Sequence, residues 1–298
     1  MRTLTLTVEP QFENCPIKDV LSKRLWVSDA LLSRLKRRSG SLLLNGEPVY
    51  VTRRVHAGDR VTVSVGDVGK DPRIRPMPMP LSVLYEDEDL LVIDKPAGLS
   101  VHPARDPDEI TLENALAAYL GADENPHPVS RLDRGTTGLL TVAKSGWAHA
   151  WMKQVQHSGQ MQKVYLAITR NMPDPPVGSV SAPIGFYEGS GYQRCVRPDG
   201  APAESDYQVL RQNGGFALIR LVPKTGRTHQ LRVHMAHIGC PLLGDWLYGS
   251  RDPSIDRPAL HAAELSFYHP LQNMTVTLHS PLPEDMRRFF PDPSGDPS

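Results

Sequence analysis

Length, composition and charge exclude several classes of protein. The chain has 298 residues, of which 40% are hydrophobic and 22% are charged, which is typical of a globular protein with a sizeable core. No apolar run is long enough to cross a bilayer, and the first residues lack the apolar core and cleavage site of a signal peptide. We therefore expect no membrane association. The three cysteines are odd in number and far apart, which argues against a disulfide framework and favours a reducing cytoplasm.

The net charge of zero combines a basic first quarter with an acidic remainder. Residues 1–76 hold 14 Lys and Arg against 8 Asp and Glu, a balance of +6, and the rest of the chain carries −6. A basic segment on a neutral protein favours a polyanionic partner, with nucleic acid first. A solvated surface with chance clustering explains the charge equally well on this ground alone.

Two short helices followed by short strands are predicted for the first part of the chain. The apolar spacing and the turn residues place helices over residues 17–25 and 29–38 and strands over 41–51 and 59–65. Asn45-Gly46 is expected to form a tight turn within the first of these strand segments, and Gly40 to end the second helix.

Three consecutive basic residues, Lys36, Arg37 and Arg38, fall in the last turn of the second predicted helix. Cations suit a helix C-terminus for dipole reasons, so the cluster has a structural explanation beside a functional one. The pattern of residues 13–66 resembles the ribosomal-protein S-four-like RNA-binding module. This resemblance implies that the three basic side chains bind RNA.

A segment rich in Gly and Pro, residues 66–80, is typical of a semi-extended linker and marks a domain boundary. The expected domains are an S-four-like module over 1–70, a linker over about 67–80, a second domain over 81–290 and a disordered tail over 291–298.

The second domain is expected to alternate strands and helices. We predict a strand hairpin within 81–103, helices over 111–120, 146–157 and 228–238, and strands over 139–143, 163–169, 205–211 and 216–222. Thr228 is the expected N-cap of the last helix, and Gly239 its stop.

The run SRLDRGTTGLL places Asp133 between Arg131 and Arg134, just before an apolar strand. If the run is extended, Arg131 and Asp133 point to one side while Leu132 anchors in the core. A neighbouring guanidinium keeps a carboxylate ionised, which suits a nucleophile or a general base. A purely structural ion pair is the alternative, because such pairs also perturb carboxylates.

Two further patterns contain candidate site residues. Tyr165 interrupts an apolar strand with a polar aromatic side chain, and Arg227 precedes the helix predicted within KTGRTHQLRVH. Four potential zinc ligands follow nearby, but their spacing matches neither a zinc finger nor a HExxH helix. They are His229, His234, His237 and Cys240. We therefore expect no metal and no cofactor.

Four motifs in order resemble the RluA-type family of RNA pseudouridine synthases. They are LYEDEDLLVIDKPAGLSVHP, SRLDRGTTGLL, QKVYLAI and PKTGRTHQLRVHMAHIGCPLLGD, and the resemblance covers residues 81–290. The resemblance implies isomerisation of uridine to pseudouridine in ribosomal RNA or transfer RNA. It also implies an α+β fold, in which a mixed, largely antiparallel sheet with flanking helices and a central RNA-binding cleft follows the small α/β module. We expect a monomer.

The resemblance assigns roles to individual residues. Asp133 would be the catalytic aspartate, Arg131 would occupy the space of the flipped-out base, and Tyr165 would stack on the target ring. Arg227 would pair with the catalytic carboxylate, and Leu231 would pack near the ring.

Two positions fit the family pattern less closely. Lys224 matches a basic substrate-binding position that only part of the family shares. Ser130 stands where many members have histidine, which affects local hydrogen bonding or RNA contact and not the chemistry.

Two alternatives come from other classes. The basic module also suits an RNA-binding or ribosome-assembly factor that has lost catalysis, although the complete set of Asp133, Tyr165 and Arg227 argues against this. A nucleoside or sugar hydrolase is the other, but such enzymes commonly use two carboxylates and the motif offers one. Whether Asp133 attacks the sugar, attacks the ring or removes a sugar proton stays open.

Overall fold

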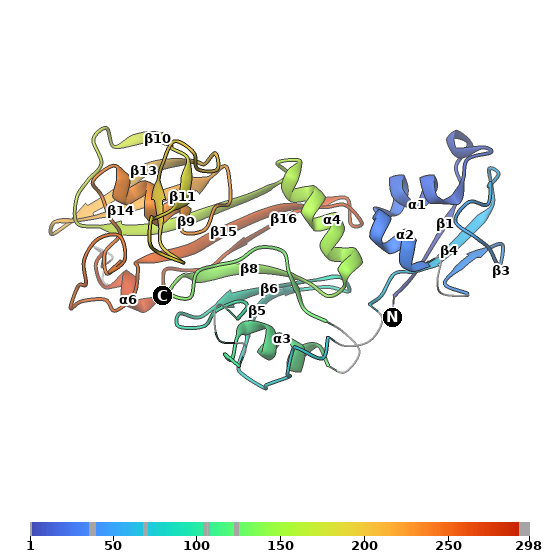
Figure 1. Ribbon diagram of the computed structural model, residues 1–298, viewed down its shortest axis with the longest axis horizontal. Helices are drawn as coiled ribbons and strands as arrows, with labels where there is room; N and C mark the ends of the chain where they lie inside the picture. Colours follow the sequence, from blue (N-terminus) through green and yellow to red (C-terminus); the bar gives the residue numbers. More distant parts are fainter. Residues whose placement is uncertain are drawn as a thin grey trace.

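A computed structural model describes residues 2–35, 40–67, 71–103, 106, 108–121 and 125–291 (Figure 1). Lys36, Arg37 and Arg38 lie outside the described residues, as does the expected tail from residue 292 onward.

The N-terminal part is a four-stranded sheet with two helices. Its elements are β1 (Thr3–Thr7), a 3-10 helix (Pro10–Phe12), α1 (Ile17–Leu25), α2 (Asp29–Leu35), β2 (Leu42–Leu44), β3 (Glu47–Pro48) and β4 (Arg60–Ser64). The strand order is β1-β4-β2-β3. Asn45 and Gly46 both have positive φ, as a tight hairpin turn between β2 and β3 requires.

The larger part is built on one extended sheet. Its strands are β5 (Ser82–Glu86), β6 (Leu90–Lys95), β7 (His127–Pro128), β8 (Thr137–Ala143), β9 (Met161–Thr169), β10 (Val177–Ser181), β13 (Glu204–Asn213), β14 (Phe216–Pro223), β15 (Leu260–His269) and β16 (Met274–His279). The main path runs β10-β13-β14-β9-β15-β8-β6-β5, with β16 on β15 and β7 on β8. Among these strand pairs only β15 and β8 run parallel.

Smaller elements surround the sheet. They are α3 (Leu112–Leu120), α4 (Gly146–His157), α5 (Gln230–His237), α6 (Glu284–Arg287) and the separate hairpin of β11 (Ile184–Phe186) and β12 (Arg194–Val196). In Figure 1, α3 lies below β5 and β6, and α4 lies above β8. This mixed, largely antiparallel α+β architecture confirms the predicted fold class.

The parallel contact between β8 and β15 depends on a glycine of the central motif. Every residue of β8 is buried, and Gly138 has φ of 106°. A Cβ on Gly138 would lie 2.3 Å from the carbonyl oxygen of Ala262, so a larger residue would push the two strands apart. Gly138 therefore keeps the start of β8, and the loop before it, close against β15.

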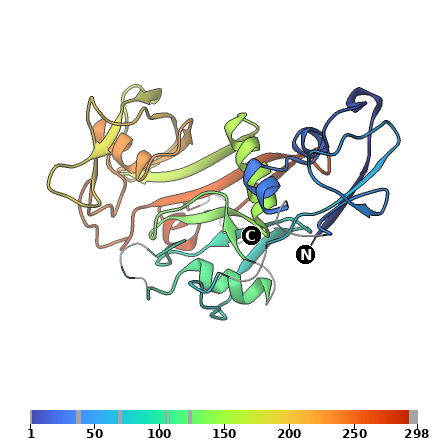
Figure 2. The ribbon, with the colours of Figure 1, turned by 45° about the vertical axis from the view of Figure 1, so that its right-hand side comes forward.

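Helix α4 of the larger part lies against the N-terminal part (Figure 2). Trp147 and Trp151 of α4 belong to the same buried apolar cluster as Leu21 and Leu25 of α1. The indole N–H of Trp147 also donates a hydrogen bond of 2.6 Å to the carbonyl oxygen of Leu25. The N-terminal part is thus packed against the larger part through a continuous core.

The last predicted helix begins two residues later than expected. His229 has φ of 58° and is the N-cap of α5, so Thr228 is not. The side chain of Gln230 explains the late start, because its Oε1 accepts hydrogen bonds from the Thr225 hydroxyl and from the Arg227 N–H. Those bonds hold the preceding loop in a non-helical turn. Gly239 has positive φ directly after the C-cap, as expected.

Candidate active site

The loop before β8 presents Asp133 to a partly open surface. Leu132 is buried, Arg131 is exposed, and the Asp133 side chain is 24% exposed. Leu132 belongs to the same apolar cluster as Tyr165 of β9 and Leu231 of α5. The alternation is the one expected for an extended run, and it sets a carboxylate at the edge of an apolar wall.

Arg232 of α5 binds Asp133 directly. Its Nη1 lies 3.1 Å from Oδ2 of Asp133, and its Nε and Nη2 lie 2.7 and 2.8 Å from the two carboxylate oxygens of Asp245. Burial disfavours the charge on Arg232, but the hydrogen bonds and charges of Asp245 and Asp133 outweigh it and raise the pKa of Arg232. The guanidinium is therefore a fixed positive charge beside Asp133.

The resemblance implied that Arg227 pairs with Asp133, but the structure does not show this pair. Arg227 is exposed, and its Nε donates to the carbonyl oxygen of Pro202 at 3.0 Å. The loop held by Gln230 turns Arg227 away, whereas Arg232 lies within α5 on the side that faces Asp133. A buried arginine in an apolar helix needs carboxylate partners, and that rule was the signal in the sequence that could have pointed to Arg232.

The other predicted residues divide into two groups. Tyr165 and Leu231 are buried in the apolar wall beside Asp133, and burial, with the charge of Asp133, raises the pKa of Tyr165. Lys224 lies at the protein surface, where its Nζ binds Oδ2 of Asp206 at 2.7 Å. The structure therefore brings Tyr165 and Leu231 to Asp133 and gives Lys224 a different partner.

His229, considered from the sequence only as a zinc ligand, and Tyr248, which was not singled out, lie beside the same carboxylate. His229 Nε2 lies 4.0 Å from Oδ2 of Asp133, and His229 Nδ1 lies 2.7 Å from the hydroxyl of Tyr248. Burial lowers the pKa of His229, so the imidazole is neutral near neutral pH.

Lys95 at the end of β6 was also missed. Its side chain is fully buried, and Nζ donates to the carbonyl oxygens of Pro96, Leu99 and Arg134 at 2.7, 2.9 and 3.3 Å. It thereby ties the turn after β6 to the loop that carries Asp133. Burial lowers the pKa of Lys95 to about 8, against the opposing attraction of Asp133.

The buried lysine predicts a pH dependence of stability. Since the folded pKa of Lys95 is about 8 and its ordinary value is 10.5, the unfolded chain binds more protons between these values, and stability rises with pH there. Relative to a Lys95→Met variant, the wild type should gain at most about 3 kcal/mol of unfolding free energy from pH 8 to 10.5. Urea unfolding of both proteins measures this difference, and parallel curves would show that Lys95 titrates with its ordinary pKa.

No cluster of three or more His, Cys, Asp or Glu that could hold a metal ion is found among the described residues. The candidate zinc ligand His234 is buried and bonds through its two ring nitrogens to Ser205 Oγ and the Ala182 carbonyl oxygen, each at 3.0 Å. Its role is therefore structural. No helix in the described part of the chain has both the length and the apolar character that crossing a membrane requires.

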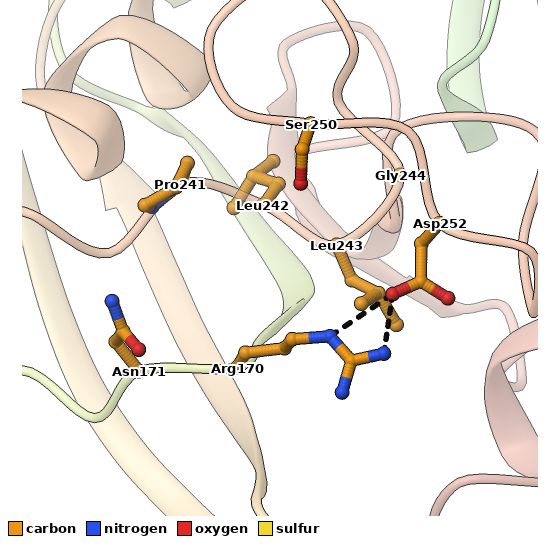
Figure 3. Close-up of a pocket in the computed structure, with 8 residues that line it drawn as sticks. All are labelled: Arg170, Asn171, Pro241, Leu242, Leu243, Gly244, Ser250 and Asp252. Carbon is orange, nitrogen blue, oxygen red and sulfur yellow. Dashed lines mark hydrogen bonds and ion pairs between the residues drawn. The ribbon is translucent and has the colours of Figure 1, made fainter.

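Two hollows lie outside this constellation. One, of about 530 Å³, borders the turn after β6 and includes Ala97 and Arg257. The other, of about 60 Å³, lies between β9 and the segment after α5 (Figure 3). Its charged groups neutralise each other, since Arg170 Nε donates to Oδ2 of Asp252 at 3.0 Å. Neither is lined by a predicted site residue.

The mixed sheet and the carboxylate at the edge of its apolar wall are those of an α+β enzyme, and comparisons with known proteins identify its class. Residues 89–237 match the family model described as RNA pseudouridylate synthase. The uncharacterized RNA pseudouridine synthase YjbO of Bacillus subtilis is 38% identical over 269 residues, which cover 89% of this chain and 95% of that protein. Ribosomal large subunit pseudouridine synthase D of Yersinia pestis is 36% identical, over 82% of this chain and 80% of that protein.

Solved structures give the same result. Human RNA Pseudouridylate Synthase Domain Containing 4 superposes with a TM-score of 0.57 at 27% identity, over 69% of this chain and 90% of that one. The chain therefore belongs to the RNA pseudouridylate synthase family. It is an isomerase that converts uridine to pseudouridine, and the predicted likeness to the RluA type is confirmed.

Proposed function

We propose that the protein isomerises specific uridines of ribosomal RNA by base flipping, with Asp133 as the catalytic carboxylate. The observation that carries this proposal is the setting of Asp133. It is a partly exposed carboxylate with one oxygen bound by Arg232, at the edge of the apolar wall formed by Leu132, Tyr165 and Leu231.

The reaction breaks the bond from ribose C1′ to N1 of uracil and forms one from C1′ to C5. The hydrogen on C5 passes to solvent as a proton, and N1 takes up a proton in turn, so that the product is an isomer of the substrate. A carboxylate bound by Arg232 can assist departure of the base, form an adduct or remove a sugar proton. The setting of Asp133 supports each of these roles equally.

The second carboxylate that Arg232 binds cannot serve hydrolysis. Asp245 is fully buried, and Arg232 occupies both of its oxygens. It is therefore not free to activate a water molecule, as the second carboxylate of a hydrolase does. This supports an isomerase over the nucleoside hydrolase that the sequence left as an alternative.

Base flipping gives Arg131 and Tyr165 separate tasks. A paired base costs a few kcal/mol to extrude from its stack. Arg131 is exposed next to Asp133 and can fill the space that the base vacates. Tyr165 in the apolar wall can stack on the extruded ring. Leu231 would then pack near the ring, and Arg227 and Lys224 would contact RNA from the surface.

Ribosomal RNA is the proposed substrate because a relative that matches most of this chain is named for the large ribosomal subunit. The N-terminal part, proposed to be an S-four-like module over residues 1–70 before a catalytic domain over 81–290, would supply additional affinity.

Three exposed aromatic side chains near the β11–β12 hairpin, Phe186, Tyr187 and Tyr192, can stack on unpaired bases. We further propose that the protein acts as a cytoplasmic monomer.

Tritium release tests the proposed function. Ribosomal RNA transcripts that contain uridine tritiated at C5 should release tritium to water when incubated with the purified protein, and the RNA should contain an equal amount of pseudouridine. Release of free uracil would instead identify a hydrolase. Binding without either product across ribosomal and transfer RNAs would favour a non-catalytic RNA-binding factor. Mapping of pseudouridine in cells with and without the gene then identifies the target uridine.

The basic cluster of the N-terminal part predicts a change in salt dependence. Replacing Lys36, Arg37 and Arg38 by alanine should weaken binding to all RNAs. Each phosphate contact that is lost lowers the number of counterions released when the RNA binds. The slope of log affinity against log salt should fall by about 0.7–0.9 per lost contact. Filter binding at several salt concentrations measures the slope, and an unchanged value would place the cluster away from the RNA backbone.

A further inference from the structure

We infer that Asp245 and Tyr248, two residues of the segment after α5, are positioning residues that hold Arg232 and His229 toward one oxygen of Asp133. The held oxygen is Oδ2, which leaves Oδ1 to meet the RNA. The inference rests on the proposed catalytic role of Asp133.

Asp245 acts on Asp133 through Arg232, and we call these contacts the first arm. Two parallel hydrogen bonds of 2.7 and 2.8 Å lock the guanidinium in one plane, and the ring of Tyr248 lies 5.0 Å from its Cζ. Only Nη1 then reaches Asp133, at 3.1 Å from Oδ2. Asp245 thus fixes which oxygen of Asp133 is bound without itself touching Asp133.

The second arm runs from Tyr248 through His229. The hydroxyl oxygen of Tyr248 accepts a hydrogen bond of 3.0 Å from the backbone N–H of Arg194. Burial raises the pKa of Tyr248 to about 12, so the hydroxyl keeps its hydrogen. Nδ1 of His229, at 2.7 Å, is its acceptor, which leaves the proton of the neutral imidazole on Nε2.

That tautomer points a donor at the catalytic carboxylate. Nε2 of His229 lies 4.0 Å from Oδ2 of Asp133, a separation that a small closure of the site turns into a hydrogen bond. The opposite tautomer would direct a lone pair at the anion and repel it. Two donors, one charged and one neutral, therefore face the same oxygen.

The surroundings of His229 keep it neutral. The charged groups around it are Asp133 and Asp245, which favour its protonation, and Arg232 and Arg194, which oppose it. Burial is the largest influence and lowers its pKa. The hydroxyl of Tyr248 is the remaining polar group in contact with it. Protonation in acid would place a hydrogen on Nδ1, which could then no longer accept the hydrogen bond from the hydroxyl of Tyr248.

The segment that carries both positioning residues is itself fixed. Gly244 has φ of 72°, and a Cβ there would lie 2.4 Å from the carbonyl oxygen of Arg257. The N–H of Gly249 donates to the carbonyl oxygen of Asp245 at 2.8 Å. Asp245 and Tyr248 are thus set three residues apart in a tight turn packed on the sheet.

Tyr248→Phe tests the second arm, because it keeps the ring beside Arg232 and removes only the hydroxyl. We expect kcat to fall about tenfold, the equivalent of one hydrogen bond, with the KM for RNA unchanged. The ¹⁵N shifts of His229, assigned with His229→Gln, should show the proton on Nε2 in the wild type and divided between both nitrogens in the variant. Tyr268→Phe is the matched control, since the hydroxyl of Tyr268 binds Asn273 on the exposed strand pair of β15 and β16.

Asp245→Asn tests the first arm by removing the charge and keeping the shape. We expect kcat to fall about 100-fold or more, again with RNA binding retained. Asp285→Asn is the control, because Asp285 makes the same two-bonded pair with the buried Arg257, which does not bind Asp133. If Asp245→Asn fails to fold, Tyr248→Phe and the tautomer measurement still decide the inference.

The outcomes separate this inference from the proposed function. If Asp133→Asn is inactive while Tyr248→Phe keeps the wild-type kcat and the wild-type His229 tautomer, the positioning roles are wrong and the function stands. A wild type that makes no pseudouridine, or an active Asp133→Asn, overturns the function itself. A fall in kcat matched by an equal loss of folded protein would show that the role of these residues is only structural.

Discussion

Replacing Asp133 by asparagine is expected to abolish pseudouridine formation and to leave RNA binding intact. Asparagine keeps the shape of the side chain but is neither a base nor a nucleophile at neutral pH. Removal of a general acid–base group alone costs about 10²–10⁴ in rate, so we expect kcat to fall at least about a thousandfold. Single-turnover tritium release measures the loss, and filter binding measures the retained affinity.

The fold should tolerate this change. The Asp133 side chain is 24% exposed, and Arg232 keeps its two bonds to Asp245. The free energy of unfolding should therefore stay within about 1 kcal/mol of the wild type. An active Asp133→Asn variant would remove the proposed mechanism, and an unfolded one would show that Asp133 supports the structure.

Replacing Arg232 by glutamine should have the largest effect on stability in the site. It leaves the fully buried Asp245 without a cationic partner. Breaking a buried ion pair on one side destabilises a protein by about 3–5 kcal/mol. Activity should also fall sharply, because Asp133 loses its bound guanidinium. Urea unfolding and tritium release at a temperature where the variant is folded measure the two effects separately.

Arg227→Gln is the matched control for this prediction. The Arg227 side chain is exposed and its Nε donates to a backbone carbonyl in the described part of the chain, so its loss should change the unfolding free energy by no more than about 0.5 kcal/mol. If Arg227→Gln abolished catalysis with wild-type RNA binding and Arg232→Gln did not, the resemblance would have named the correct arginine and the geometry would be misleading.

The spacing of apolar residues predicted the helices that bury one face against the core. Helices α1 and α4 begin and end at the predicted residues 17–25 and 146–157, since one apolar stripe faces the core in each. The hairpin of β5 and β6 and the strand β9 were predicted as well. Strand β15, in the middle of the sheet, was missed although burial alternates along its second half, ELSFYH. Its first four residues, LHAA, are all buried and show no alternation that would mark a strand.

The candidate site was predictable only in part. The motif located Asp133, and the alternation around Leu132 indicated which way the carboxylate faces. It could not decide between Arg227 and Arg232, because five residues separate them and the choice depends on where α5 begins. That start is set by the side chain of Gln230 binding backward into the loop, a tertiary detail that no spacing rule contains. Lys95 was missed for a similar reason, since only the fold brings three carbonyl oxygens around it.

The continuous apolar cluster between α1 and α4 bears on how a target uridine is chosen. Because Trp147 and Trp151 of α4 pack with Leu21 and Leu25, the N-terminal part sits at a set offset from Asp133. RNA gripped by that part would be held at a constant span from the reacting carboxylate. If that part binds RNA as proposed, the protein would select a uridine by its distance from an anchoring structure in the RNA as well as by its neighbouring bases.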